Sequence, residues 1–149
     1  EAVAVLGFAA TVVVLFHRTD RDRIGFYGPV AGVLAGAIAA GIGLTFAFGP
    51  VRPELVVSHY RLNLLGFLGL TIVGVTYQFY PPTVGRFPGA GDRLGLGAMG
   101  AIGLGLAVEV VGAAFAHDLA VRGGQTLALA GALAYAYLLL GVFVQRARG

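Results

Sequence analysis

His59, Asn63 and Gly66 are the residues whose types and spacing could do chemistry. They lie in SHYRLNLLGFLGLTIVGVTYQFYPP, residues 58–82, a stretch that is otherwise largely apolar. At about 100° per residue, the fourth and seventh positions after His59 fall on its own helical face. An imidazole that shares its helical face with a small polar side chain and a glycine could ligate a metal or a haem iron. It could equally anchor a helix among lipid headgroups, where amphipathic side chains gather.

The elements that must position these residues are membrane-spanning helices. The 149-residue chain is 58% hydrophobic, has a mean hydropathy of +0.87 and contains no Cys. Apolar runs occupy about residues 1–16, 28–49, 57–80, 93–116 and 125–144. Four of them can cross a hydrocarbon core of about 30 Å, whereas the first is short and begins at Glu1, as in a helix clipped at its outer end. We expect an all-α, multi-pass transmembrane bundle of about five helices, forming a single integral membrane domain.

The basic residues, all arginines, orient this bundle. They are scattered between apolar runs, so the pI near 9.7 indicates membrane topology and not a nucleic-acid partner. One set of alternate connections, together with the C-terminus, holds Arg18, Arg21, Arg23, Arg86, Arg93, Arg146 and Arg148. The opposite set holds Arg52, Arg61 and Arg122. The positive-inside rule therefore predicts a cell-membrane protein with its N-terminus outside and its C-terminus in the cytoplasm.

This topology places two of the three histidines on one face of the membrane. His59 opens the third apolar run at its outer end, and His117 closes the fourth run on the same side. His17 ends the first run on the opposite side. Two neutral imidazoles on consecutive antiparallel helices are suited to be the axial ligands of a b-type haem, so His59 and His117 are the predicted metal ligands.

Small and cationic residues near both histidines suit such a cofactor. Gly112 and Ala113 lie about one turn inward from His117, as Asn63 does from His59, and Gly66 lies a further turn inward. A porphyrin needs a face without bulky side chains, and the Asn63 amide could hydrogen-bond a ligand or a propionate. Two arginines on the same outer side, Arg61 and Arg122, could pair with the propionates, because guanidinium groups bind carboxylates well.

The segment from His59 to Pro82 also resembles the second transmembrane helix of the haem-copper oxidase subunit I superfamily. It is most similar to small stand-alone subunit I-like membrane proteins and to the branch that contains nitric-oxide reductases. The shared features are an opening His, a small polar residue, Gly plus an aromatic, I-x-G, a further aromatic and a closing Pro. Here they are His59, Asn63, Gly66-Phe67, Ile72-Val73-Gly74, Tyr77 and Pro81. The resemblance implies that His59 is an axial ligand of a low-spin haem, and it does not extend to His117.

The superfamily's oxygen-reducing centre needs further histidines, three of them for copper. This chain has three histidines in all. Oxygen or nitric oxide reduction by this chain alone is therefore not expected. The predicted function is that of a membrane b-type haem protein in electron transfer or redox sensing.

Glu109 is an ionisable residue inside the fourth apolar run, roughly 12 Å deeper than His117 at helical rise. An isolated carboxylate is costly there unless it is protonated, paired or hydrated. One interpretation is proton transfer coupled to haem redox, or a polar contact to the haem edge. The other is a neutral carboxyl group hydrogen-bonded to a neighbouring helix. The sequence does not decide between these two interpretations of Glu109.

The 25 glycines indicate close helix contacts. Gly28, Gly32 and Gly36 follow one another at four-residue spacing, which favours tight packing between helices. The alternative function is a non-haem accessory or assembly subunit that packs against a larger membrane complex. The expected partners are the lipid bilayer and, through the glycine-rich faces, a second copy of the chain or a larger respiratory-type complex.

Overall fold

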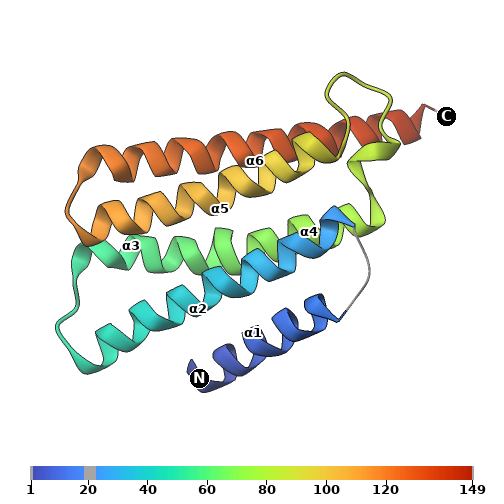
Figure 1. Cartoon of the computed structure of the whole chain (residues 1–149). Coiled ribbons are helices and arrows are strands. Elements are labelled where there is room, and N and C mark those ends of the chain that lie inside the picture. Colours follow the sequence, from blue (N-terminus) through green and yellow to red (C-terminus); the bar gives the residue numbers. More distant parts are fainter. Residues whose placement is uncertain (1, 19–22, 149) are drawn as a thin grey trace.

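A computed structural model describes residues 2–18 and 23–148 of the chain. Its elements are α1 Ala2–His17, η1 Ile24–Phe26, α2 Tyr27–Phe48, α3 Pro53–Arg61, η2 Leu62–Gly69, α4 Leu70–Phe79, η3 Pro82–Val84, α5 Asp92–Ala114 and α6 Asp118–Ala147. The π-helical segment η2 joins α3 and α4 into one continuous rod, so the fold is five helical rods that run alternately up and down (Figure 1). This architecture confirms the predicted all-α bundle.

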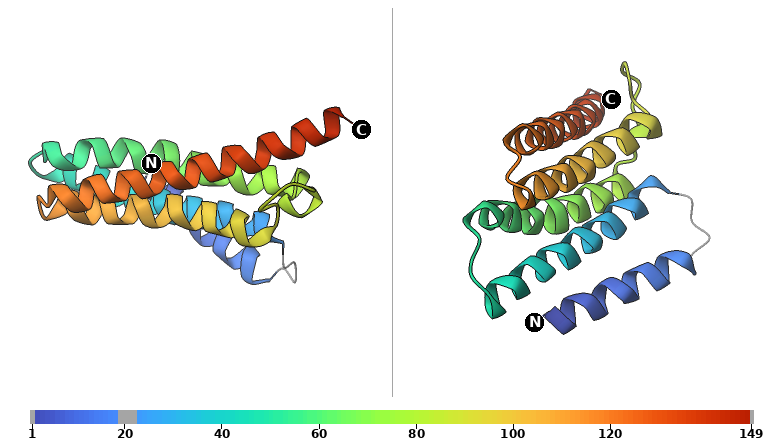
Figure 2. Two further views of the ribbon diagram at one scale, coloured as in Figure 1. Left: turned by 90° about the horizontal axis from the view of Figure 1, so that it is seen from above. Right: turned by 60° about the vertical axis from the view of Figure 1, so that its left-hand side comes forward.

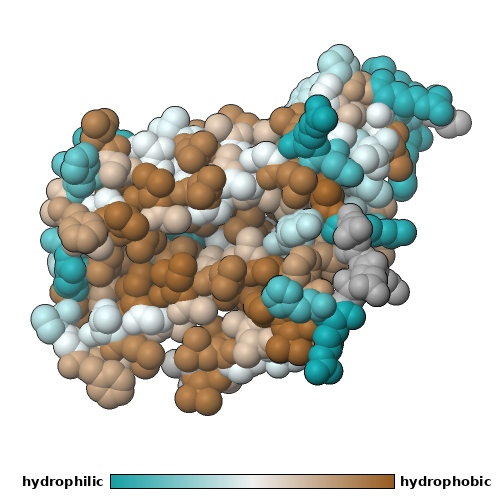
Figure 3. Space-filling model, viewed as in Figure 1, coloured by the Kyte–Doolittle hydropathy of each residue, from teal (hydrophilic) through white to brown (hydrophobic). Residues whose placement is uncertain are grey.

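Four of the rods are long and apolar enough to cross a membrane. They cover residues 24–48, 53–79, 92–114 and 118–147, whereas α1 is a shorter apolar helix. The space-filling view has polar residues at both ends of the bundle and mainly apolar residues between them (Figure 3). Length, composition and surface therefore agree with the membrane character predicted from the sequence.

The rods lie in sequence order, with the α3–η2–α4 rod in the middle (Figure 2). It packs against α2 on one side and against α5 on the other, and α6 packs closely on α5. The main partner of α1 is α2. The side of the middle rod that packs on α2 and the side that packs on α5 are therefore separate environments.

The start of α6 differs from the sequence prediction by seven residues. The connection was expected to continue to residue 124, yet the helix begins at Asp118. Only the turn around Ala116, which has a positive φ of 52°, separates α5 from α6. Gly123 and Gly124 resemble turn residues in the sequence, but Gly124 is buried inside the helix, where it allows α5 to approach.

Glycine makes the α5–α6 contact possible. A Cβ on Gly105 would lie 2.5 Å from the Ala128 backbone nitrogen, and one on Gly131 would lie 2.6 Å from the Ala98 carbonyl oxygen. Backbone atoms cannot move away as a flexible side chain can. The two helices are therefore held at a separation that only glycine permits, which is how helices associate in lipid.

We predict that Gly124→Ala destabilises the bundle by about 2 kcal/mol through overpacking. Its Cβ would lie 2.5 Å from the Gly105 carbonyl oxygen and 2.6 Å from the Glu109 backbone nitrogen. Gly123→Ala is the matched control, because a Cβ there has no neighbour within 4 Å. Unfolding in mixed micelles compares the two variants, and equal stabilities would contradict this account of the α5–α6 contact.

A second glycine contact joins α2 to the middle rod, as the spacing of Gly28, Gly32 and Gly36 predicts. A Cβ on Gly28 would lie 2.5 Å from the Gly74 Cα, and one on Gly32 would lie 2.8 Å from the Phe67 carbonyl oxygen. A Cβ on Gly36 would lie 3.0 Å from the Phe67 ring. The sequence interpretation of these glycines as packing residues therefore holds along the α2 face of the rod.

Candidate functional site

Two polar residues near the start of the middle rod point to opposite sides. His59 contacts α2 and Arg61 contacts α5, since two residues correspond to about 200° of helical rotation. The π-helical segment begins directly after Arg61. Segments of this kind are rare and are often found at functional sites. No pattern in the sequence predicts this segment.

The His59 ring is oriented by the backbone of α2. Its Nδ1 lies 3.0 Å from the carbonyl oxygen of Ala39. Because a carbonyl oxygen can only accept, Nδ1 carries the proton of the neutral ring, and Nε2 keeps its lone pair. The Asn63 amide donates to the His59 carbonyl at 2.9 Å and lies 3.4 Å from Nε2. Histidines that ligate a metal usually donate their other ring N–H to a backbone carbonyl, a carboxylate or water, as His59 does here.

His59 and Asn63 line a groove of about 620 Å³ between the first three rods. Its other lining residues are Val5, Gly36, Ala40, Gly43, Leu44, Ala47 and Phe67. The α2 wall consists mainly of glycine and alanine, so the backbone of α2 is open to the groove. A Cβ on Gly43 would lie 3.3 Å from His59 Cε1. The groove is thus apolar, has one small-residue wall and presents one imidazole.

His117 is not part of this groove. α3 and the α5–α6 turn lie at the same end of the bundle, as the topology predicted (Figure 1). The His117 ring is exposed, and its Nδ1 accepts a hydrogen bond of 3.2 Å from the Ala120 backbone N–H, which caps α6. The His59 ring lies on the side of α3 that faces α2. The structure therefore does not bring the two predicted ligands together, and His17 ends α1 at the opposite end.

Unlike Asn63, the small residues Gly66 and Gly112 and the predicted propionate partner Arg122 do not line this groove. A Cβ on Gly66 would meet the Ala35 side chain at 2.6 Å, and one on Gly112 would meet the Val121 backbone nitrogen at 2.7 Å. Both glycines thus serve helix packing. Arg122 is exposed on α6. The Arg52 guanidinium donates to the Ala114 carbonyl at 2.8 Å and ties the α2–α3 loop to the end of α5, a contact that the sequence did not predict.

A buried ion pair lies on the α5 side of the middle rod. Arg61 Nε is 2.8 Å from Glu109 Oε2, and the Glu109 side chain is 1% exposed while that of Arg61 is 31% exposed. The other carboxylate oxygen, Oε1, has no hydrogen-bond partner among the described residues. A contact from Glu109 to a neighbouring helix was one of the two interpretations that the sequence left open, and neither of them named Arg61 as the partner. The depth argument used for the histidines does not predict this pair, because Arg61 lies two residues from His59 whereas Glu109 lies eight residues from His117.

The described part of the chain forms an all-α bundle in which four helices are suited to cross a membrane. No family model matches the chain, and no significant similarity to a curated protein or a solved structure was found. The resemblance of residues 59–82 to subunit I therefore stays a prediction. Within the described ranges, no group of three or more His, Cys, Asp and Glu side chains is placed to hold a metal ion.

Proposed function

We propose that the chain is a membrane b-type haem protein that acts in electron transfer or redox sensing, with His59 as an axial ligand. The observation that supports it most strongly is the orientation of the His59 ring. Nδ1–H is bound to the Ala39 carbonyl, and the basic Nε2 belongs to a ring that lines the groove. The resemblance of the same helix to subunit I assigns the same role to the same residue.

The residues of the groove fit a flat, largely apolar cofactor. Gly36, Ala40 and Gly43 leave the α2 backbone open on one wall, and the Phe67 ring forms part of the lining. Asn63 is the polar group next to His59 and could donate to a bound ligand. When bound, haem supplies a one-electron carrier whose potential depends on its axial ligands and on burial.

The protein's own contribution is binding and orientation. The Ala39 carbonyl orients the His59 ring through Nδ1, which leaves Nε2 as the ring nitrogen that could bind a metal ion. The mainly apolar walls of the groove suit the apolar faces of such a cofactor. His117 lies outside the groove, so no residue is assigned as a second ligand of the haem iron. The spin state of the iron would report whether a second strong ligand is present.

Filling the groove tests this proposal directly. Gly43→Leu points a side chain at His59 Cε1 and should weaken haem binding by about tenfold or more. The matched control is Gly41→Leu on the same helix, because a Cβ at Gly41 has no neighbour within 4 Å. The purified chain is titrated with haem b in detergent, and the Soret band is recorded. Equal affinities for the two variants would contradict the groove as the site.

The alternative function, a non-haem accessory or assembly subunit, has one observation in its favour. A Cβ on Gly97 or on Gly100 of α5 would meet nothing within 4 Å, so packing within the described part of the chain does not explain these glycines. Open glycines permit close approach of another helix. A wild-type chain that binds no haem, together with a loss of self-association in Gly100→Leu, would favour this alternative.

A further inference from the structure

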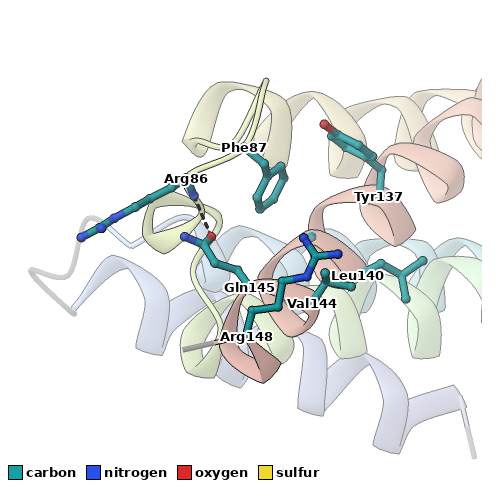
Figure 4. A pocket seen from close by; sticks show the side chains of 8 residues that line it. Arg86, Phe87, Tyr137, Leu140, Val144, Gln145 and Arg148 are labelled. Carbon is teal, nitrogen blue, oxygen red and sulfur yellow. Dashed lines mark hydrogen bonds between the residues drawn. The ribbon is translucent and has the colours of Figure 1, made fainter.

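A second groove lies at the opposite end of the bundle, between the 85–91 loop and the last turns of α6. It has a volume of about 470 Å³ and is lined by Arg86, Phe87, Tyr137, Leu140, Gly141, Val144, Gln145 and Arg148. Figure 4 shows the Phe87 and Tyr137 rings on one side and the Arg148 side chain on the other. The haem proposal makes no use of these residues.

The loop is fixed to α6 by several contacts that shape the groove. A Cβ on Gly141 would lie 2.5 Å from the Phe87 ring, so glycine lets the ring approach the helix. The Phe87 and Tyr137 rings meet edge to face at 5.5 Å, and the Tyr137 hydroxyl donates to the Pro88 carbonyl at 2.7 Å. The Arg86 backbone N–H donates to Gln145 Oε1 at 2.8 Å. These contacts hold the 85–91 loop against α6, so the groove between them has a defined shape.

The donors at this groove are cationic and polar. The Arg148 guanidinium extends over Val144 toward the groove, whereas the Arg86 side chain points away from it (Figure 4). No carboxylate within ion-pair distance of Arg148 is found in the described part of the chain. Arg146 is already engaged, since its guanidinium stacks on the Tyr80 ring at 4.8 Å. With its Oε1 bound to Arg86, Gln145 can offer its amide N–H groups to a ligand.

The position of the groove along α6 indicates a ligand that has both an apolar part and an anionic part. The 30 residues of α6 span about 45 Å, which exceeds a hydrocarbon core of about 30 Å. Its last turns therefore reach the headgroup region. The lining changes along the helix from Leu140 and Val144 to Gln145 and Arg148, in the order in which a lipid changes from acyl chain to phosphate.

We propose that this groove binds an anionic phospholipid, with an acyl chain along Leu140 and Val144 and the phosphate at Arg148 and Gln145. Basic pockets at the cytoplasmic side of membrane helices bind anionic headgroups in this way. The side also agrees with the arginine distribution, which predicts that the C-terminal end of α6 faces the cytoplasm. The proposal does not depend on haem binding.

Native mass spectrometry of the full chain tests it, with phosphatidylglycerol and phosphatidylcholine offered in equal amounts. We expect one retained phosphatidylglycerol in preference to phosphatidylcholine. Arg148→Gln should lower that preference by about fivefold, the effect of one arginine at an anionic surface. Arg122→Gln, an exposed arginine at the other end of the same helix, should leave it unchanged.

Three results would overturn the proposal. Equal retention of the two lipids would remove the headgroup preference, and equal effects of Arg148→Gln and Arg122→Gln would indicate diffuse charge attraction. Displacement of the lipid by millimolar inorganic phosphate would show that the groove binds phosphate alone and makes no use of the acyl chain. Thermal unfolding of both variants in detergent without added lipid checks that neither substitution impairs folding.

Discussion

Haem binding is expected to be lost in His59→Ala. The substitution removes Nε2, the ring nitrogen left unprotonated by the hydrogen bond from Nδ1–H to the Ala39 carbonyl. Apolar contacts in the groove cannot replace an iron–nitrogen bond, so we expect no saturable Soret band at haem concentrations that saturate the wild type. The helix should persist, because Ala is the strongest helix former and Pro53 and Glu54 at the start of α3 are unchanged. Absorption spectroscopy and circular dichroism measure the two properties.

The other two histidines are built-in controls. His17→Ala should leave haem binding unchanged, since His17 ends α1 at the opposite end of the bundle. His117→Ala should also retain haem, at a cost of about 1 kcal/mol in stability for the lost cap of α6. The sequence-based assignment of His117 as the second axial ligand predicts instead that His117→Ala loses the low-spin spectrum. Such a loss would mean that His117 reaches the iron after a rearrangement. Wild-type spectra in His59→Ala would contradict the proposed site.

The largest expected effect on stability comes from the Arg61–Glu109 pair. Arg61→Ala leaves a carboxylate that is 1% exposed without its partner. Removing one member of a buried pair typically costs roughly 3–5 kcal/mol, and we expect the lower end of that range because the Arg61 side chain is itself 31% exposed. Unfolding in mixed micelles measures the loss.

Replacing both members separates pairing from burial. A double variant, Arg61→Leu with Glu109→Leu, should recover most of the stability lost in either single variant, because no unpaired charge remains between α3 and α5. Additive losses in this double-mutant cycle would show that the two side chains do not act as a pair. A Glu109→Leu variant as stable as the wild type would show the same.

The sequence predicted the helices well because their signal is strong. Long apolar runs with charged or Gly- and Pro-containing breaks specify membrane helices, and the bounds of α2 and α5 were predicted to within two residues. The start of α6 was predicted less accurately, since Gly123 and Gly124 are the same residue type in the sequence but have different surroundings in the fold. Only the contact of Gly124 with α5 distinguishes them.

The candidate site was predicted in part. His59 and Asn63 were identified together, and they do share one groove. Pairing His59 with His117 used depth alone, and depth does not say which side of a helix a residue faces. His59 faces α2, whereas His117 follows α5. The orienting bond from His59 to Ala39 joins residues 20 positions apart and has no pattern in the sequence, because any residue supplies a backbone carbonyl.

The most direct test of the central claim uses a chain in which His59 is the only histidine. The His17→Ala, His117→Ala double variant is labelled with ¹⁵N-histidine and loaded with haem b, and pulsed electron paramagnetic resonance of the ferric iron is recorded. We predict a hyperfine coupling from a directly bound ¹⁵N nucleus, which can come only from His59. A variant that binds haem without this coupling, or that binds no haem while the wild type does, would contradict His59 as the axial ligand.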